Sequence, residues 1–261
     1  MTPDDLLAHF DQGRLWAANS TWNTAQAYQA QLAVRGLRIA RGEQPRGFKI
    51  GFTNRTIWPR YGVDGPIWGT VWNTTLSHCE EDGVVSLGLS CQPRIEPEAV
   101  FGIARTPPLQ ASLQELFDCV EWVAPGFEIV QSHSPGWKFK AADTIADGGL
   151  HAHLLVGRKV PVREVADSAA GLDGVLASCA VSLLQDGVQR DSGRGANVLD
   201  GPLHALHHFL QELSACPGAP PLQAGDVVTT GTWTDAWPVE QGQTWAAAFG
   251  APLGRLAVRF S

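Results

Sequence analysis

The segment "PRIEPEAVFGIA", residues 93–104, combines the pattern of a β-strand with two carboxylates. Short apolar runs separated by turn residues lead into it from residue 83, which is typical of β structure. Side chains alternate along a strand with a period of two, so Glu96 and Glu98 point to the same face. Pro97 lacks an N–H group for a sheet ladder, which indicates an edge or a bulge. The segment therefore predicts a strand that presents two acids side by side.

Further strands are predicted downstream. "GFEIVQS" at 126–132 reads as a short strand that starts directly after a helix, and "GLHAHLLVG" at 149–157 reads as another. "GVLASCAVSLLQDG" at 174–187 is predicted as a strand that ends in an Asp-Gly hairpin turn. "GDVVTTGT" at 225–232 and two more short strands close the chain.

Three segments carry helical signals instead. "TAQAYQAQLAVRGLRIARGE" at 24–43 has apolar residues at helical spacing and lacks proline. "SLQELFDCVEWVA" at 112–124 predicts a helix with Ser112 as N-cap and Glu115 in a capping box. "GPLHALHHFLQELSA" at 201–215 predicts an amphipathic helix with a leucine-rich stripe. We therefore expect an α+β, β-rich protein.

Length and composition limit the class of protein. A chain of 261 residues, 44% hydrophobic and 17% charged, fits one large domain. Its net charge of −7 argues against a nucleic-acid surface, which needs dense lysine and arginine. We expect no membrane span, because no apolar run approaches 18 residues, and no signal peptide, because the first residues are acidic. Five scattered cysteines favour reduced thiols and a cytoplasmic location.

A third carboxylate bears on whether the glutamate pair is a metal site or a surface feature. Glu128 interrupts the apolar run "GFEIV", where a core residue is expected. Three carboxylates without a matching histidine or cysteine set favour a hard cation such as Mg²⁺, Mn²⁺ or Ca²⁺. The alternative is an exposed pair on a sheet and an unrelated glutamate. The residues alone leave both interpretations open.

Five blocks in fixed order carry a family resemblance. They are "GFKIGFTN" (47–54), "PRIEPEAVFGIA" (93–104), "GFEIVQS" (126–132), "WKFKAADTIAD" (137–147) and "GDVVTTGTWTDAWPVEQGQTWAAAFGAPLGRLAVRF" (225–260). Together they resemble the 2-keto-4-pentenoate hydratase and 4-oxalocrotonate decarboxylase branch of the fumarylacetoacetate hydrolase superfamily. The resemblance covers roughly residues 45–260. It implies a mixed-sheet roll as a catalytic domain over residues 46–261, preceded by a helical N-terminal arm over residues 1–45.

The resemblance also implies the residues of a site. It implies Mg²⁺ or Mn²⁺ held by Glu96, Glu98 and Glu128. The family's active-site lysine falls on Lys49, whose pKa we expect desolvation beside a cation to lower toward neutrality. The block at 137–147 lines the same cavity in the family, which adds three candidate catalytic residues: Lys138, Lys140 and Asp143.

The activity that the resemblance implies is a metal-dependent lyase reaction on a 2-oxo or 2-hydroxydienoate. A 2-oxo acid chelates a metal through its carboxylate and C2 oxygens, and the metal stabilises the enolate. We expect a hydratase that forms a 4-hydroxy-2-oxo acid in aromatic-compound breakdown. The alternatives are a 4-oxalocrotonate-type decarboxylase, an acylpyruvate hydrolase and a non-catalytic partner subunit. Family members form homo-oligomers, and some work in complexes with related pathway enzymes.

One stretch departs from the family pattern. Family hydratases carry "V-D-E-P-D" after the lysine block, whereas this chain has "VDGPI", with Gly65 and Ile67 in place of the acids. Because of this departure, the sequence does not decide among hydration, decarboxylation and hydrolysis. It also does not identify the tail of the substrate.

Several large side chains are candidates for the substrate pocket. The tryptophans near the departure, Trp68 and Trp72, form with Phe52 either an apolar pocket wall or ordinary core. Among the histidines, His133 is the strongest pocket candidate, with a structural role as its alternative. His151 and His153 alternate on a predicted strand, without a third ligand for a metal in that block.

Overall fold

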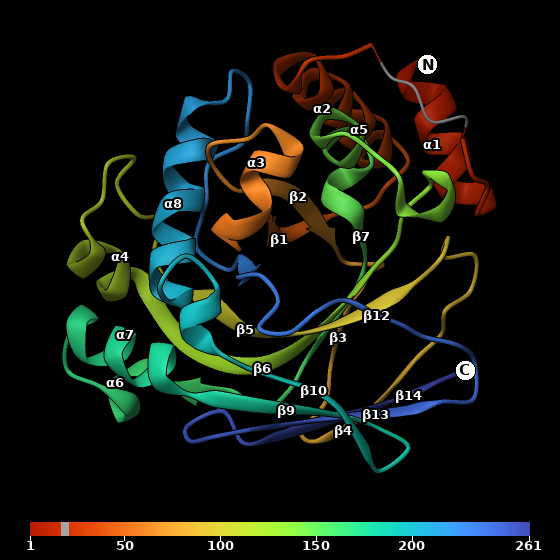
Figure 1. Cartoon of the computed structure of the whole chain (residues 1–261). Helices are drawn as coiled ribbons and strands as arrows, with labels where there is room; N and C mark the ends of the chain where they lie inside the picture. Colours follow the sequence, from red (N-terminus) through yellow and green to blue (C-terminus); the bar gives the residue numbers. More distant parts are fainter. Residues whose placement is uncertain (17–20) are drawn as a thin grey trace.

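The fold is built on two β-sheets with helices along one side and at one end (Figure 1). The computed structural model describes residues 1–16 and 21–261. Within those residues, nine strands form a large mixed sheet and five form a smaller one. This confirms the predicted α+β, β-rich class.

The large sheet positions the site. Its main path runs in the order β2 (Ile67–Trp72), β1 (Pro45–Gly51), β11 (Val227–Thr229), β5 (Arg94–Ile103), β6 (Val120–Val130), β7 (His151–Val156) and β3 (Leu76–His78). The short strands β12 (Trp237–Pro238) and β8 (Val160–Pro161) pair with β5 and β6. β1 lies parallel to β11, and β3 lies parallel to β7, while the remaining pairs are antiparallel.

The smaller sheet lies beneath the large one in Figure 1. Its order is β10 (Val188–Arg194), β9 (Ala180–Gln185), β13 (Thr244–Phe249), β14 (Arg255–Phe260) and β4 (Asp82–Val85). The β9–β10 hairpin turns at Asp186-Gly187, as the sequence predicted. Asp186 has a positive φ of 48°, a conformation that aspartate tolerates better than most residues.

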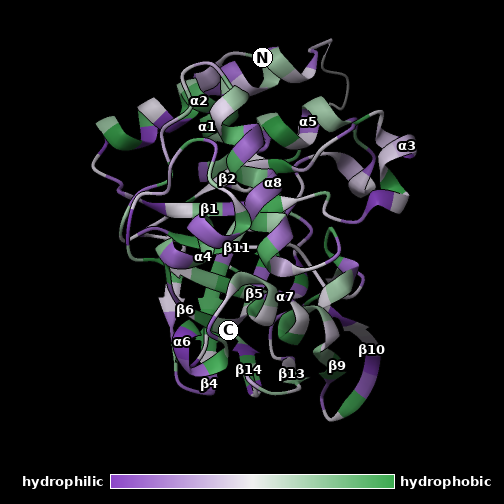
Figure 2. Cartoon of the chain, turned by 90° about the vertical axis from the view of Figure 1, so that its left-hand side faces the viewer, coloured by the Kyte–Doolittle hydropathy of each residue, from purple (hydrophilic) through white to green (hydrophobic). Residues whose placement is uncertain are grey.

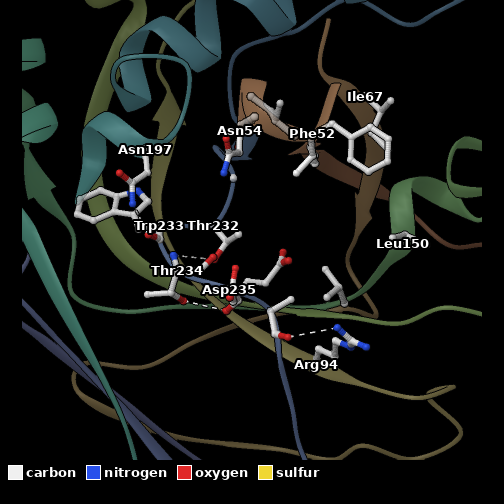
Figure 3. A pocket seen from close by; sticks show the side chains of 18 of the residues that line it. Phe52, Asn54, Ile67, Arg94, Leu150, Asn197, Thr232, Trp233, Thr234 and Asp235 are labelled. Carbon is white, nitrogen blue, oxygen red and sulfur yellow. Dashed lines mark hydrogen bonds between the residues drawn. The ribbon is translucent and has the colours of Figure 1, made fainter. Parts of the chain in front are cut away.

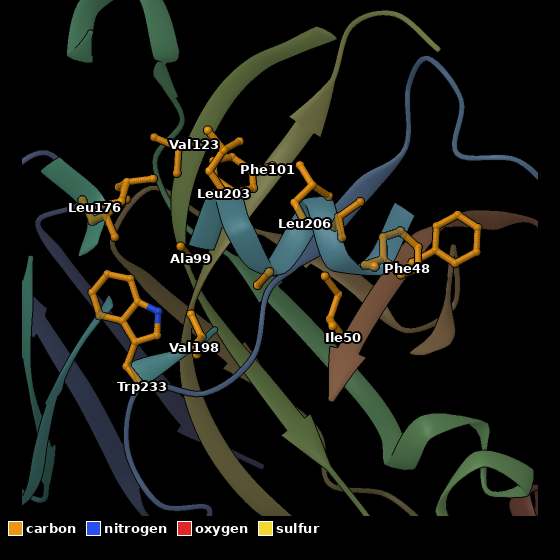
Figure 4. Close-up of a cluster of buried hydrophobic side chains, with 14 of the residues drawn as sticks. Phe48, Ile50, Ala99, Phe101, Val123, Leu176, Val198, Leu203, Leu206 and Trp233 are labelled. Atoms are coloured by element: carbon orange, nitrogen blue, oxygen red, sulfur yellow. The ribbon is translucent and has the colours of Figure 1, made fainter. Parts of the chain in front are cut away.

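Helix α8 (Pro202–Ala215) buries its apolar stripe against the large sheet. Leu203 and Leu206 meet Phe48 of β1 and Phe101 of β5 in the main core (Figure 4). The opposite face of α8 is hydrophilic, and Figure 2 shows both colours along the helix. The predicted amphipathic helix is thus confirmed, with its histidines at the edge of the core, half-buried.

The remaining helices are short or belong to the N-terminal part. Helices α4 (Leu113–Cys119) and α7 (Ala169–Ser178) lie beside α8, α6 (Val162–Val165) lies beside α7, and α3 (Trp58–Tyr61) follows β1. The described chain also has 3-10 turns, which are η1 (Arg55–Ile57), η2 (Pro135–Trp137), η3 (Gly148–Leu150) and η4 (Gly195–Asn197). Helix α2 (Thr24–Ala40) packs on α5 (Ala141–Ala146), and α1 (Pro3–Gln12) packs on α2. Leu6, Ala27 and Val34 share a small core with Ile67 and Ile145. The division into an arm over 1–45 and a catalytic domain over 46–261 stays a prediction.

Two sequence predictions were wrong in their boundaries. The helix predicted over 112–124 keeps its capping box but ends at Cys119, because Val120 begins a long strand paired with β5. The strand predicted over 174–187 starts only at Ala180, since residues up to Ser178 belong to α7. In both cases the sequence shows no clear break between the helical and the strand part, and the strand begins where pairing with a distant strand begins. No helix in the described part of the chain is long and apolar enough to span a membrane.

Candidate functional site

Strands β5 and β6 bring three carboxylates together. Glu96 of β5 lies opposite Glu128 of β6 in the antiparallel register, and Glu98 follows two residues on, on the same face. One oxygen from each of the three side chains lies within 4.8 Å of the others. Glu98 and Glu128 are fully buried, whereas Glu96 borders a cavity. The structure thus gathers the carboxylates that the sequence singled out.

The last residue of β11 and the loop after it hold Glu98. Thr229 Oγ1 donates a hydrogen bond to Glu98 Oε2, and the Gly231 N–H donates to the same oxygen at 2.6 Å. Gly231 has a φ of +99°, and a Cβ there would lie 2.0 Å from Thr53 Oγ1, so the backbone can approach only as glycine. The sequence alone indicated no role for Thr229 or Gly231. Two donors on one oxygen leave the other oxygen, Oε1, buried without a hydrogen-bond partner among the described residues.

Lys49 is the buried cation of the site. Its Nζ donates to the Gly149 carbonyl at 2.8 Å and lies 3.2 Å from Glu128 Oε2. Burial by itself lowers the pKa of Lys49, but the charges of Glu128, Glu96 and Glu98 outweigh it and raise the pKa. In the metal-free protein the pKa of Lys49 is therefore raised, because three carboxylates stabilise the ammonium; the lowering expected beside a bound cation stays a prediction.

A chain of hydrogen bonds orients Glu128. His151 Nδ1 lies 2.9 Å from Glu128 Oε1, and His151 Nε2 lies 2.9 Å from Thr75 Oγ1. The backbone N–H of Trp72 donates to Thr75 Oγ1 at 3.1 Å, and the hydroxyl hydrogen has two acceptors in reach, His151 Nε2 at 2.9 Å and, farther away, the Trp72 carbonyl at 3.4 Å. Burial, then the charges of Lys49 and Arg38, lower the pKa of His151 well below its usual value. A neutral imidazole with hydrogen on Nδ1 satisfies every bond in this chain.

The three carboxylates suit a hard divalent cation. Burial raises the pKa of Glu96 and of Glu128 to about 7, and raises that of Glu98 well above its usual value. Buried acids at this spacing repel one another, and Lys49 offsets only part of the charge. Glu98 Oε1 is buried and accepts no hydrogen bond from the described residues, so it is available as a ligand atom. Carboxylate oxygens alone are the donor set of Mg²⁺ and related ions.

A cavity of about 450 Å³ reaches Glu96 of the carboxylate cluster, and Figure 3 shows other side chains of its lining. Lys49 and Glu96 line its inner end. Apolar side chains form one wall, with Phe52, Ile67 and Leu150 labelled in Figure 3. Amide and hydroxyl groups line another wall, where the figure labels Asn54, Asn197, Thr232 and Thr234. The cavity therefore joins a charged inner end to a mixed, roomier outer part.

Of the predicted pocket aromatics, the structure places Phe52 at the cavity and the two tryptophans elsewhere. Phe52 lines the wall and stacks on Tyr61 with centroids 4.8 Å apart. Trp68 is buried between Tyr28 and Phe48. Trp72 lies under the guanidinium of Arg38 at 4.3 Å. The predicted wall of tryptophans is thus corrected: the side chains of β2 alternate, and these two face away from the cavity lining.

His133 does not line the cavity either. It is fully buried, and its Nδ1 lies 2.6 Å from Asp147 Oδ1. The rings of Phe10 and Trp16, from the N-terminal segment, cover it at 4.6 and 5.1 Å between centroids. The prediction of a pocket contact is corrected in favour of its structural alternative, since His133 anchors the N-terminal segment.

The block at 137–147 contributes differently from what its family pattern implied. Lys138 and Lys140 are exposed and lie outside the cavity lining. Asp143 is buried, and its Oδ2 accepts the backbone N–H of Lys140 at the start of α5. The cavity residues of this segment are instead Trp137 and Phe139.

Of the two positions that depart from the family pattern, only Ile67 lines the cavity. Ile67 pairs with Gly51 in the β1–β2 register and lines the apolar wall. Gly65 lies outside the lining, against Glu212, where an added Cβ would lie 2.6 Å from Oε1. An apolar side chain therefore occupies one of the two positions where an acid was expected.

Comparison with known proteins fits the fold and this geometry. Residues 69–260 match the sequence profile of the fumarylacetoacetate (FAA) hydrolase C-terminal domain. The chain belongs to the fumarylacetoacetate hydrolase family. That stretch spans both sheets and includes Glu96, Glu98 and Glu128.

Three similar proteins illustrate the family. The chain is 31% identical over 221 residues to a 2-hydroxyhexa-2,4-dienoate hydratase of Comamonas testosteroni, covering 83% of this chain and 78% of that protein. It is 30% identical over 224 residues to a 2-keto-4-pentenoate hydratase of Burkholderia vietnamiensis, covering 85% and 80%. Its fold matches the 4-oxalocrotonate decarboxylase from Pseudomonas putida G7, solved with magnesium and adipate, with a TM-score of 0.85, 24% identity and coverage of 100% and 99%.

Proposed function

We propose that this protein is a divalent-metal-dependent hydro-lyase that adds water to a 2-hydroxydienoate to give a 4-hydroxy-2-oxo acid. The main support for the proposal is the cluster of three carboxylates beside the cavity, in which Glu98 Oε1 is buried without a hydrogen-bond partner among the described residues. Two hydratases at 30–31% identity support the reaction type, and their names fit the breakdown of aromatic compounds.

Glu96, Glu98 and Glu128 would hold the ion, Mg²⁺ or Mn²⁺. Such an ion, when bound, polarises the carboxylate and C2 oxygens of a 2-oxo acid and stabilises negative charge there. Glu98 is held by the loop after β11, and Glu128 by His151 and Lys49. Two of the three carboxylates are therefore fixed in place by other residues of the chain.

Lys49 is the candidate acid–base group of the reaction. In the metal-free protein the neighbouring carboxylates raise its pKa, so Nζ carries a proton there, and its place on the cavity lining brings Nζ within reach of a substrate carbon or oxygen. The Gly149 carbonyl and Glu128 restrain the ammonium. The apolar wall of Phe52, Ile67 and Leu150 limits access of bulk water to the same end.

Decarboxylation is the second candidate, and Ile67 is the observation that favours it. An apolar side chain stands where family hydratases carry an acid, and loss of CO₂ needs no activated water. Homo-oligomer formation, a complex with a related pathway enzyme and a cytoplasmic location stay predictions of the family resemblance.

Turnover with defined substrates tests the proposal. The purified protein with Mg²⁺ or Mn²⁺ should consume 2-hydroxypenta-2,4-dienoate, seen as loss of dienol absorbance, with a 4-hydroxy-2-oxo acid as product. Released CO₂ from 4-oxalocrotonate without hydration of the dienoate would favour the second candidate. Unchanged absorbance over a panel of dienoates would contradict the proposal, provided Mn²⁺ binding shows the site to be loaded.

A further inference from the structure

The backbone turn over residues 147–150 carries the carbonyl that binds Lys49. Lys49 Nζ donates to the Gly149 carbonyl at 2.8 Å and lies 3.2 Å from Glu128 Oε2. An ammonium has three hydrogens, so these two contacts leave one hydrogen for the cavity that Lys49 lines. Because the lysine side chain is long and flexible, the position of the Gly149 carbonyl helps to decide where Nζ stands.

The conformation of this turn is unusual. Gly148, Gly149 and Leu150 have φ angles of +63°, +70° and +68°, the longest run of positive φ within residues 1–16 and 21–261. A left-handed conformation is unfavourable for leucine, because its Cβ comes too close to the following carbonyl oxygen. Such a conformation persists only where the surrounding structure enforces it, and it is found often at active sites.

Asp147 and His133 enforce the conformation of the turn. Asp147 Oδ2 accepts the backbone N–H of His133 at 2.9 Å, and Oδ1 lies 2.6 Å from Nδ1 of the same histidine. At the other end of the turn, the Leu150 N–H donates to the Asp147 carbonyl at 2.9 Å, and the Leu150 carbonyl accepts the Gln131 N–H at 2.8 Å. The turn is therefore tied at both ends to the segment that follows β6.

The turn is also enclosed from two sides. A Cβ on Gly69 of β2 would lie 2.0 Å from the Gly148 carbonyl oxygen, so the turn rests directly on that strand. On another side, a Cβ on Gly148 would lie 3.4 Å from Phe10 Cζ, and the rings of Phe10 and Trp16 cover His133. His133 and Asp147 are fully buried, and hydrogen bonds shielded from water in this way are strong.

Neither member of the His133–Asp147 pair belongs to the site itself. Both lie outside the cavity lining, and neither is among the three clustered carboxylates. A buried carboxylate is costly to a fold unless its hydrogen bonds are made, and here both oxygens bind one residue. The turn that this pair fixes reaches the site at Gly149, through Lys49.

We propose that the His133–Asp147 pair positions Lys49 for catalysis by fixing the turn over residues 147–150 and, with it, the Gly149 carbonyl. The pair acts through the backbone and contacts neither substrate nor metal. This inference rests on the proposed function, in which Lys49 is the acid–base group.

Kinetics on 2-hydroxypenta-2,4-dienoate with Mg²⁺ test the role of Asp147. Asp147→Ala should lower kcat about 10- to 100-fold, because a misplacement of about 1 Å is enough to disturb the alignment for proton transfer. KM and the affinity for Mn²⁺ should change far less, because Glu98 keeps its bonds to Thr229 and Gly231. Asp147→Asn keeps an acceptor for the His133 N–H, so its kcat should fall between those of the wild type and Asp147→Ala.

Two further variants separate positioning from a general loss of stability. Leu116→Ala removes a buried side chain of the main core outside the cavity lining, and should lower the melting temperature while keeping kcat. Gly69→Ala leaves the pair intact but would displace the Gly148 carbonyl from β2, and should show the same loss of kcat as Asp147→Ala. Gly69→Ala also tests the proposal if Asp147→Ala does not fold.

Two kinetic outcomes would overturn the inference. Wild-type kcat together with a lower melting temperature in Asp147→Ala would limit the pair to a structural role. A loss of Mn²⁺ affinity as large as the loss of kcat would assign the pair to the metal centre instead.

Crystal structures separate this inference from the proposed reaction. The wild type and Asp147→Ala, or Gly69→Ala in its place, are compared with Mn²⁺ and oxalate bound. A contact of Nζ with the Gly149 carbonyl that is present in the wild type and lost in the variant supports positioning even if no dienoate is turned over. An unchanged position of Nζ in the variant overturns the inference even if the hydratase reaction is observed.

Discussion

Glu96 and Glu128 occupy directly opposed positions of the antiparallel strands β5 and β6. Residues so paired share a face of the sheet, and like charges there destabilise it unless a cation lies between them. Glu98 adds a third acid on that face, and Lys49 supplies one positive charge from β1. The sheet itself, rather than a flexible loop, therefore sets the geometry of the candidate metal site.

Removing one acid should abolish tight metal binding and stabilise the metal-free protein. We expect Glu98→Gln to weaken Mn²⁺ affinity by more than about 100-fold. Mutating residues that only orient metal ligands already lowers metal affinity ~10- to 100-fold, and loss of a ligand should cost more. At a pH high enough to ionise Glu98, the melting temperature without metal should rise, because the amide removes one buried like charge and keeps an oxygen for Thr229 and Gly231. Calorimetry with Mn²⁺ and thermal unfolding measure the two effects. The exposed Glu121→Gln on β6 serves as the control; wild-type Mn²⁺ affinity in Glu98→Gln would contradict the assignment.

The hydroxyl of Thr75 should matter for metal binding although it lies outside the ligand set. Thr75→Val removes the donor that keeps hydrogen on Nδ1 of His151, and hence weakens the bond to Glu128. We expect a loss of Mn²⁺ affinity of ~10-fold, at the lower end of such effects. Thr75→Ser keeps the hydroxyl and should bind as the wild type does. Equal affinities for the Val and Ser variants would rule out this chain of hydrogen bonds.

His153 should make the protein sensitive to acid. Burial, and then the neighbouring His151, lower the pKa of His153 to about 4 from its usual 6.5. Between these values the unfolded imidazole binds a proton and the folded one does not, so stability falls as pH drops from 6.5 to 4. The loss attributable to this group is at most about 2–3 kcal/mol.

Urea unfolding at pH 6.5, 5.0 and 4.5 measures this loss. His153→Gln can keep the contact with Ser77 Oγ, which is 2.8 Å in the wild type, and should show a shallower pH dependence. The same slope in both proteins would assign the acid sensitivity to other groups.

The stripe of α8 should carry much of the stability of the main core. Leu206 is fully buried against the large sheet, so Leu206→Ala should lower the free energy of unfolding by about 2–5 kcal/mol. Gln211→Ala, on the exposed face of the same helix, should change it by less than about 0.5 kcal/mol. Chemical denaturation measures both, and similar values for the two variants would contradict the orientation of the helix.

The sequence predicted those features that depend on local periodicity. The period of two placed Glu96 and Glu98 on one face, and the helical stripe of α8 was visible in its leucines. The same periodicity does not say which face of β2 meets the cavity, so the sequence left Trp68 and Trp72 open between a pocket wall and ordinary core. Strand boundaries near Val120 and Ala180 depend on pairing with distant strands, which no local pattern encodes.

The electrostatics of the site were the least predictable part. Lys49 was identified, but the sign of its pKa shift depends on three carboxylates from two other strands. The contact of His151 with Glu128 was missed because it crosses between β6 and β7 beside a register shift. The resemblance to the family supplied Glu128 as a third ligand, whereas the roles of Thr229 and Gly231 emerge only from the fold.

The position of a bound metal ion tests the central claim most directly. Crystals soaked with Mn²⁺ and oxalate, a mimic of a 2-oxo acid chelate, would locate the ion by its anomalous scattering. We expect one site with oxygens of Glu96, Glu98 and Glu128 about 2.0–2.3 Å from the ion, and oxalate on its cavity side. An ion bound elsewhere, or three glutamates without an ion at saturating Mn²⁺, would contradict the assignment of this cluster as the metal centre.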